Sequence, residues 1–141
     1  MTGRDYLGRL FEYQEEIDRV EDRMLRMRDS HLVSCLTDMP RAASRDNQAQ
    51  EKKMIAYAEY NEQKEQMEQR LKDMKLEATS KLALLSKASY EQVLYFRYID
   101  MDPWPVVAEK MDGKTVDNAY RLHREALREL DTILADDPYI S

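Results

Sequence analysis

Residues 46–86 contain neither glycine nor proline, and glutamate, glutamine, lysine, methionine and alanine dominate them. Side chains of these types lose little rotamer freedom in a helix, whereas glycine and proline interrupt one. We therefore expect one continuous helix of about 40 residues, roughly 60 Å long at 1.5 Å per residue. A helix of this length needs a partner along one side, because packing of an amphipathic face supplies most of the stability of a helix in a protein.

A second long helix is predicted near the amino end, at about residues 4–28. Its apolar residues alternate spacings of four and three, the heptad pattern of a coiled-coil seam: Tyr6, Leu10, Tyr13, Ile17, Val20, Met24 and Met27. The helix at 46–86 carries a similar seam, made of Tyr57, Tyr60, Met67, Leu71, Met74, Ala78 and Leu85, with Lys64 and Lys81 between them. These lysines either fix the register of the seam or extend their ammonium groups to its edge.

The periodicity fails between Asp29 and Arg45, so a loop or broken turn is expected there. The two helices then fold back on each other as a helical hairpin or coiled-coil arm over residues 1–86. Since the predicted first helix is only about half as long as the second, part of the second seam is left for another chain. We therefore expect a homo-oligomer, specifically a dimer; the alternative is that both seams pack against each other inside one hairpin.

Residues 87–141 fit a second domain with three short helices. A capping box of Ser89 and Gln92 begins the first, Asp102-Pro103 begins the second, and Lys114 or Thr115 begins the third after an Asp112-Gly113 turn. The residues expected to be buried between these helices are Val93, Leu94, Trp104, Val107, Ala108, Met111, Leu122 and Ala126. The predicted fold is thus all-α, with a helical arm followed by a carboxy-terminal three-helix helix-turn-helix domain.

In a helix-turn-helix, the amino-terminal half of the third helix enters the major groove of DNA. The residues expected to contact bases or phosphates are Lys114, Thr115, Asn118, Tyr120, Arg121 and Arg124, together with the acidic Asp117. Arginine and lysine donate to guanine or phosphate, and asparagine pairs with adenine. From Lys114 to Arg128 there are four Lys and Arg against two acids, so the patch is slightly positive.

Three stretches resemble region 4 of the sigma-70 factors: Val93–Ile99, Trp104–Met111 and Arg121–Arg124. Trp104 and the Arg121-Leu122-His123 run are similar to a phage subgroup, the ArpU/RinA-like transcriptional regulators of Gram-positive phages. The resemblance covers roughly residues 89–130. It implies control of late phage genes, such as those for packaging and lysis. The chain departs from the pattern at Asn118, where a buried valine is usual, so either the helix is rotated locally or Val116 takes that place.

Charge and composition limit the other possibilities. The net charge is −6, with 15 Lys and Arg against 17 acids up to residue 86 and 7 against 11 after it, so DNA binding would have to rest on a local patch. The single cysteine, Cys35, excludes an internal disulfide and favours a reducing compartment. No motif for catalysis, a metal or a cofactor is found, and no apolar run is long enough to span a bilayer. We expect a non-enzymatic protein in the cytoplasm of a bacterial host cell.

The function predicted from the sequence is a phage-type transcriptional regulator that binds double-stranded DNA and oligomerises through its arm. Host RNA polymerase is left open as a further partner. Two alternatives remain, a small-terminase-like component of DNA packaging and a helical adaptor of RNA polymerase that does not bind DNA. The overall negative charge favours the second alternative.

Overall fold

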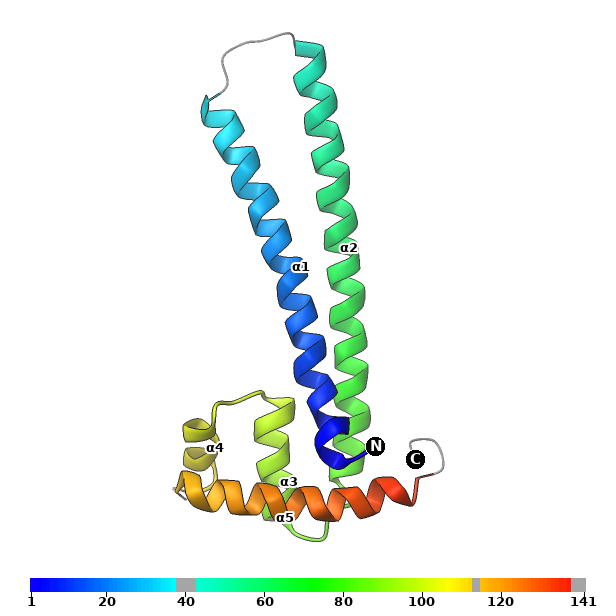
Figure 1. Ribbon diagram of the computed structural model, residues 1–141, viewed down its shortest axis with the longest axis vertical. Coiled ribbons are helices and arrows are strands. Elements are labelled where there is room, and N and C mark those ends of the chain that lie inside the picture. Colours follow the sequence, from blue (N-terminus) through cyan, green and yellow to red (C-terminus); the bar gives the residue numbers. More distant parts are fainter. Residues whose placement is uncertain (38–42, 113–114, 138–141) are drawn as a thin grey trace. The chain divides into compact units, whose positions relative to one another are not determined.

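The computed structural model describes residues 1–37, 43–112 and 115–137. These residues form α1 (Gly3–Thr37), α2 (Ala43–Leu82), α3 (Ala88–Leu94), η1 (Tyr95–Ile99), α4 (Trp104–Lys110) and α5 (Val116–Ala135), as Figure 1 shows. Within this described part of the chain no strand occurs, so the predicted all-α class is confirmed. No helix of the described part is both long enough and apolar enough to cross a membrane.

The chain divides into two compact units. The terminal unit combines Met1–Tyr13 with Leu71–Ser141, and the middle unit is Gln14–Arg70. The boundaries fall inside α1 and α2, so each of these helices contributes residues to both units. The division into an arm over residues 1–86 and a domain over residues 87–141 stays a prediction.

The first helix extends well beyond its predicted end. α1 continues to Thr37, through part of the predicted loop, and spans 35 residues against 40 in α2. The chain has no glycine or proline between Gly8 and Pro40, so loss of the apolar seam after Met27 does not force the helix to end. Because the two helices are of similar length, the argument for a dimer from unequal lengths was wrong.

The second helix begins and ends earlier than predicted, at Ala43 and Leu82 rather than at residues 46 and 86. Its last turn tightens, because the amides of Leu84 and Leu85 donate to carbonyls three residues back. Glu129 of α5 then accepts hydrogen bonds from Ser86, at 2.7 Å from the backbone nitrogen and 3.0 Å from the hydroxyl. A contact distant in sequence thus stabilises the turn, which local propensity could not predict.

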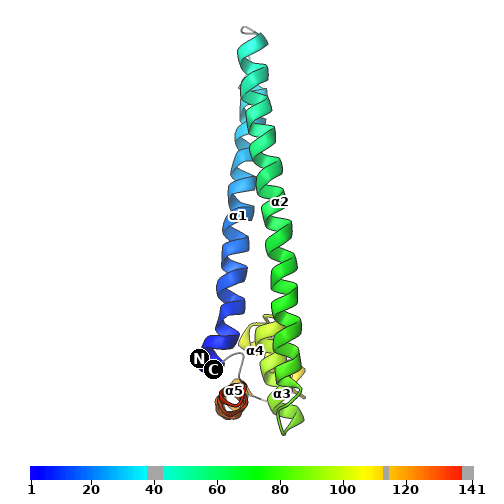
Figure 2. The same ribbon diagram turned by 90° about the vertical axis from the view of Figure 1, so that its right-hand side faces the viewer.

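In the middle unit, α1 and α2 run antiparallel, as Figures 1 and 2 show. Ile17, Val20 and Met24 of the predicted seam are buried. Lys64 of the opposing seam lies at its edge, with its ammonium group 3.6 Å from Glu21 of α1 and 3.7 Å from Glu68 of α2. Its side chain is 23% exposed, so this lysine extends along the seam to reach carboxylates at the surface.

The core of the terminal unit is built on α5, against which α3 and α4 pack. Seven of the eight residues predicted to be buried between the short helices are buried: Val93, Leu94, Val107, Ala108, Met111, Leu122 and Ala126. Trp104, the eighth, is only half-buried. α5 adds Ala119, Leu130 and Leu134 to this core, which completes one apolar side of an amphipathic helix.

The first turns of α1 bury two lines of residues, whereas the heptad seam predicted burial of only one line. Tyr6 and Leu10 lie on that seam, and both are buried. Gly3, Leu7 and Phe11 form a second line at four-residue spacing. The Gly3 amide donates a hydrogen bond to the Asp131 carboxylate of α5. The Phe11 ring lies edge-on to the Tyr98 ring of η1, with the ring centres 5.5 Å apart. Leu7, between Gly3 and Phe11 in this line, is fully buried.

Local geometry at the short helices departs from the prediction in three places. α4 begins at Trp104 with Pro103 as its N-cap and has no side-chain cap, so the predicted start at Asp102-Pro103 was one residue early. α3 begins at Ala88 with Lys87 as its N-cap and has no side-chain cap, so the predicted capping box of Ser89 and Gln92 was wrong. Between α3 and α4 the helix widens into the π-helical η1, where the Asp100 amide donates to the Tyr95 carbonyl five residues back. Met101 follows with φ 57°, a left-handed conformation that reverses the chain toward α4.

Candidate nucleic-acid interface

The predicted DNA-contacting residues cluster at the amino-terminal half of α5. Thr115 is the N-cap of this helix, and its hydroxyl accepts a hydrogen bond of 3.2 Å from the Asn118 amide. Asn118, Tyr120, Arg121 and Arg124 are all exposed, on the sides of α5 away from its buried residues. Lys114 lies outside the described residues.

Asn118 does not occupy a buried position, although the sigma-70 pattern has a buried valine there. Ala119 is fully buried and Val116 is half-buried, so these small apolar residues supply the contacts of the first turn of α5. The side-chain carboxamide of Asn118 is therefore exposed to solvent. Of the two alternatives left open by the sequence, Val116 in the place of the valine agrees better with this burial.

An aromatic cluster lies behind the exposed face of α5. The Trp104 ring of α4 lies edge-on to the rings of Tyr120 and His123, with ring centres 4.7 Å and 4.9 Å away. The guanidinium group of Arg97 lies 5.0 Å from the centre of the Trp104 ring and donates a hydrogen bond of 2.9 Å to the Asp102 carbonyl. These contacts pack α4 and η1 against α5. One side of the exposed Tyr120 ring therefore packs against Trp104.

His123 belongs to the interior of this cluster and not to its outer surface. Its ring stacks on Tyr98 of η1, and its Nε2 shares a hydrogen bond of 2.7 Å with the Tyr98 hydroxyl. Burial, followed by the nearby charges of Arg4 and Arg97, lowers the pKa of His123 from 6.5 to about 4. Burial also raises the pKa of Tyr98. Both groups are therefore neutral at pH 7.

The two arginines of the predicted site have different surroundings. Arg121 lies 3.6 Å from Glu125, whose carboxylate also accepts a hydrogen bond of 3.0 Å from the Tyr90 hydroxyl. Arg124 instead lines a hollow of about 310 Å³ in the terminal unit, together with Thr2, Arg4, Leu127, Arg128 and Asp131. Sequence reasoning missed Arg4 at this site, because its distance along the chain from α5 gave no signal of proximity.

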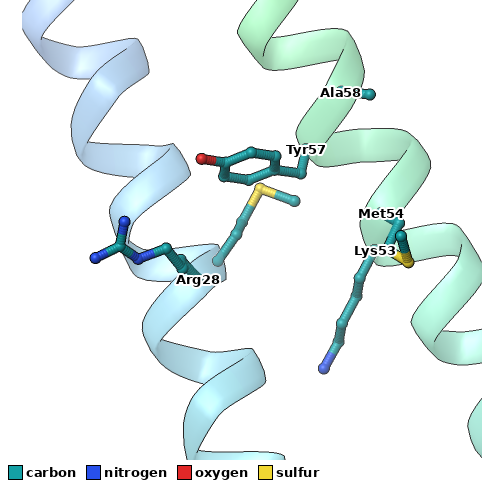
Figure 3. A pocket seen from close by; sticks show the side chains of 6 residues that line it. Arg28, Lys53, Met54, Tyr57 and Ala58 are labelled. Carbon is teal, nitrogen blue, oxygen red and sulfur yellow. The ribbon is translucent and has the colours of Figure 1, made fainter.

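A separate apolar groove lies in the middle unit, between α1 and α2. Its volume is about 450 Å³, and Met27, Arg28, Lys53, Met54, Tyr57 and Ala58 line it. Figure 3 shows the ring of Tyr57 reaching from α2 toward α1, while Arg28 and Lys53 place charged groups at the margin. We call this surface the middle-unit groove.

Among the described residues, no group of three or more His, Cys, Asp or Glu side chains is arranged to hold a metal ion. Comparison of the chain with protein-family models, with curated proteins and with solved structures gave no match.

Proposed function

We propose that this protein is a phage-type transcriptional regulator that binds double-stranded DNA with the exposed face of α5. The observation that carries the proposal is the division of α5 into two faces. One face is buried at Ala119, Leu122 and Ala126, and the rest of the helix surface exposes Asn118 and Arg121, which have the chemistry of base recognition. α4 packs against the buried face, so α5 is supported as a recognition helix is in a helix-turn-helix.

Control of late genes, such as those for packaging and lysis, is the role that the sigma-70 region 4 resemblance supports. The resembling stretches include η1, α4 and the middle of α5. Their shared positions Val107, Ala108 and Leu122 are buried, as the resemblance implies.

The proposal includes pairing of two copies through the middle unit. Exposed apolar side chains of this unit include Met54 at 68%, Ile55 at 58% and Leu25 at 45%. Met54 also lines the middle-unit groove, and contiguous apolar surface of that kind marks interaction sites. With a net charge of −6, one protomer would hold DNA weakly, so two linked copies would gain affinity from binding together.

The direct test is selection of the full-length protein on a random pool of duplex DNA, followed by anisotropy titration of the enriched sequence. We expect enrichment of a defined sequence, and a loss of affinity of about 1–3 kcal/mol for Asn118→Ala or Arg121→Ala if each contacts a base. Arg19→Ala is the matched control, since Arg19 is an exposed arginine of the middle unit. Absence of any enriched or retained duplex at low salt would contradict the proposal.

The adaptor alternative is supported by exposed acids on the same helix, among them Asp117 and Asp131. Such an adaptor would bind polymerase without shifting either random or promoter DNA. A packaging component of the small-terminase type would instead form a ring of many copies, which light scattering separates from a dimer. The DNA titration and the mass in solution therefore distinguish all three functions.

A further inference from the structure

Three arginines from two distant parts of the chain share one hollow of the terminal unit. Arg4 comes from the first turn of α1, and Arg124 and Arg128 come from successive turns of α5. The hollow measures about 310 Å³. Arg124 and Arg128 are four residues apart, so they project from the same side of α5.

In the lining of this hollow, arginines outnumber acids by three to one. None of the three makes an ion pair with another residue in the described ranges 1–37, 43–112 and 115–137, and all three are exposed. Asp131 is the one acid that lines the hollow, and its carboxylate accepts a hydrogen bond from the Gly3 amide. The lining residues therefore carry three positive charges and one negative charge, which favours an anion in the hollow.

The backbone at Arg4 is held by the contacts of its neighbours at the start of α1. Gly3 is bound to Asp131, and the Thr2 hydroxyl accepts a hydrogen bond of 3.1 Å from the Asp5 amide. The charge of Arg4 also contributes to the low pKa of His123, which agrees with its closeness to α5. The amino end of the 35-residue α1 adds a partial positive charge on the same side.

We propose that Arg4, Arg124 and Arg128 form a clamp for a backbone phosphate of DNA. Guanidinium groups match the geometry of phosphate oxygens and bind them with charge-assisted hydrogen bonds. The inference rests on the proposed DNA-binding function and deepens it in two ways. It adds the amino-terminal helix to the interface, and it assigns Arg124 to the DNA backbone, so that base recognition rests on Asn118 and Arg121.

The test measures the salt dependence of binding to a labelled duplex of random sequence. For full-length protein, the logarithm of the binding constant falls with the logarithm of salt concentration by about 0.9 for each phosphate contact. We expect Arg4→Gln and Arg128→Gln each to reduce this slope, and the double variant to reduce it by about 0.9 in total, because the clamp holds a single phosphate. Arg19→Gln, the matched control in the middle unit, should leave the slope unchanged. Circular dichroism melting confirms that each variant is folded.

A second measurement tests anion binding by the three arginines independently of DNA binding. Inorganic phosphate is titrated into the protein at constant ionic strength, and the side-chain Nε–Hε NMR signals of the arginines are followed. In the wild type we expect phosphate to shift the signals of Arg4, Arg124 and Arg128. In Arg4→Gln we expect phosphate no longer to shift the signals of Arg124 and Arg128.

Each combination of results decides between the two proposals. If the duplex binds with the same salt slope in wild type and Arg4→Gln, the clamp is overturned and DNA binding stands. If no duplex binds but phosphate shifts the three signals, the anion clamp stands and the proposed function fails. If neither duplex nor phosphate has an effect, both are overturned.

Discussion

The hydroxyl of Tyr98 and Nε2 of His123 lie 2.7 Å apart, and their rings stack with centres separated by 5.6 Å. This pair joins η1 to the middle of α5, one turn from the exposed residues proposed to contact DNA. The Trp104 ring of α4 packs edge-on against the His123 ring of this pair. The orientation of α5 therefore depends on a neutral histidine inside the terminal unit.

Acidification is expected to weaken this contact. The pKa of His123 is about 4 in the folded protein against 6.5 ordinarily, so between these values the unfolded chain binds more protons than the folded one. The contribution of His123 to the free energy of unfolding is complete above pH 6.5 and is lost as the pH falls toward 4. Urea unfolding across this range measures it.

The control for this prediction is His123→Phe, which keeps an aromatic ring and removes the titrating group. Carboxylates titrate in both proteins, so only the difference in pH dependence is attributed to His123. We expect the wild type to lose more stability than His123→Phe between pH 6.5 and 4. Equal pH dependence of the two proteins would show that His123 is not held neutral by its surroundings.

The burial of the short helices could be predicted because their apolar residues recur at three- and four-residue spacing. Met111, the C-cap of α4, follows Val107 by four residues, Ala126 follows Leu122 by four residues in α5, and all four are buried. The same reasoning missed the full burial of Leu7, because a heptad pattern assigns one apolar seam to a helix and the first turns of α1 have two. The line of Gly3, Leu7 and Phe11 was the signal that could have revealed the second one.

The candidate site was predictable only where its residues are close in sequence. The exposure of Asn118 and Arg121 follows from the period of α5, since the residues that face its core are fixed by Ala119 and Leu122. Arg4 could not be assigned, because it reaches the site through tertiary packing. The π-helical turn of η1 was likewise beyond prediction, since no propensity scale separates it from an α-helix over five residues.

Removal of the Tyr6 hydroxyl is expected to be harmless or stabilising. This hydroxyl is buried and makes no well-aligned hydrogen bond within the described residues, and burial, followed by the charge of the nearby Glu77 carboxylate, raises the pKa of Tyr6 to about 12. Tyr6→Phe should therefore change the free energy of unfolding by about 0 to +1 kcal/mol, because a buried polar group with at most a poorly aligned interaction is removed. Tyr98→Phe is the matched control and should cost about 1 kcal/mol, because it breaks the hydrogen bond to His123. A larger loss for Tyr6→Phe than for Tyr98→Phe in urea titrations would contradict this account.

Charge placed in the middle-unit groove should separate the proposed dimer into monomers. Met54 lines the groove and is 68% exposed, so Met54→Lys removes an apolar contact with a second copy without opening a cavity in the protomer. Sedimentation equilibrium is expected to show a dissociation constant at least tenfold higher for the variant, equivalent to about 1.4 kcal/mol. Leu76→Lys is the control, because Leu76 is also 68% exposed on α2 but lies outside the groove. An unchanged mass for Met54→Lys, or an equal effect of Leu76→Lys, would remove the groove from the interface.

Two glycines of α1 are expected to respond to alanine in opposite directions. Nothing lies within 4 Å of a Cβ added at Gly8, so Gly8→Ala should stabilise the protein by about 0.5–1 kcal/mol through helix propensity. A Cβ at Gly3 would lie 3.0 Å from the Asp131 carboxylate and 3.1 Å from Cδ2 of Leu130. Leu130 is fully buried among its neighbours, so we expect its displacement to be unfavourable and Gly3→Ala to cost about 1–3 kcal/mol through overpacking.

Urea unfolding of the two variants separates helix propensity from close packing, because the same methyl group is added twice to one helix. Gly3 approaches α5 closely enough for its amide to bind Asp131, and that contact places Arg4 beside Arg124 and Arg128. A stabilising effect at Gly3 equal to that at Gly8 would mean that the first turn of α1 is not held against α5. Arg4 would then lack the support that the phosphate clamp requires, so this stability measurement also bears on DNA binding.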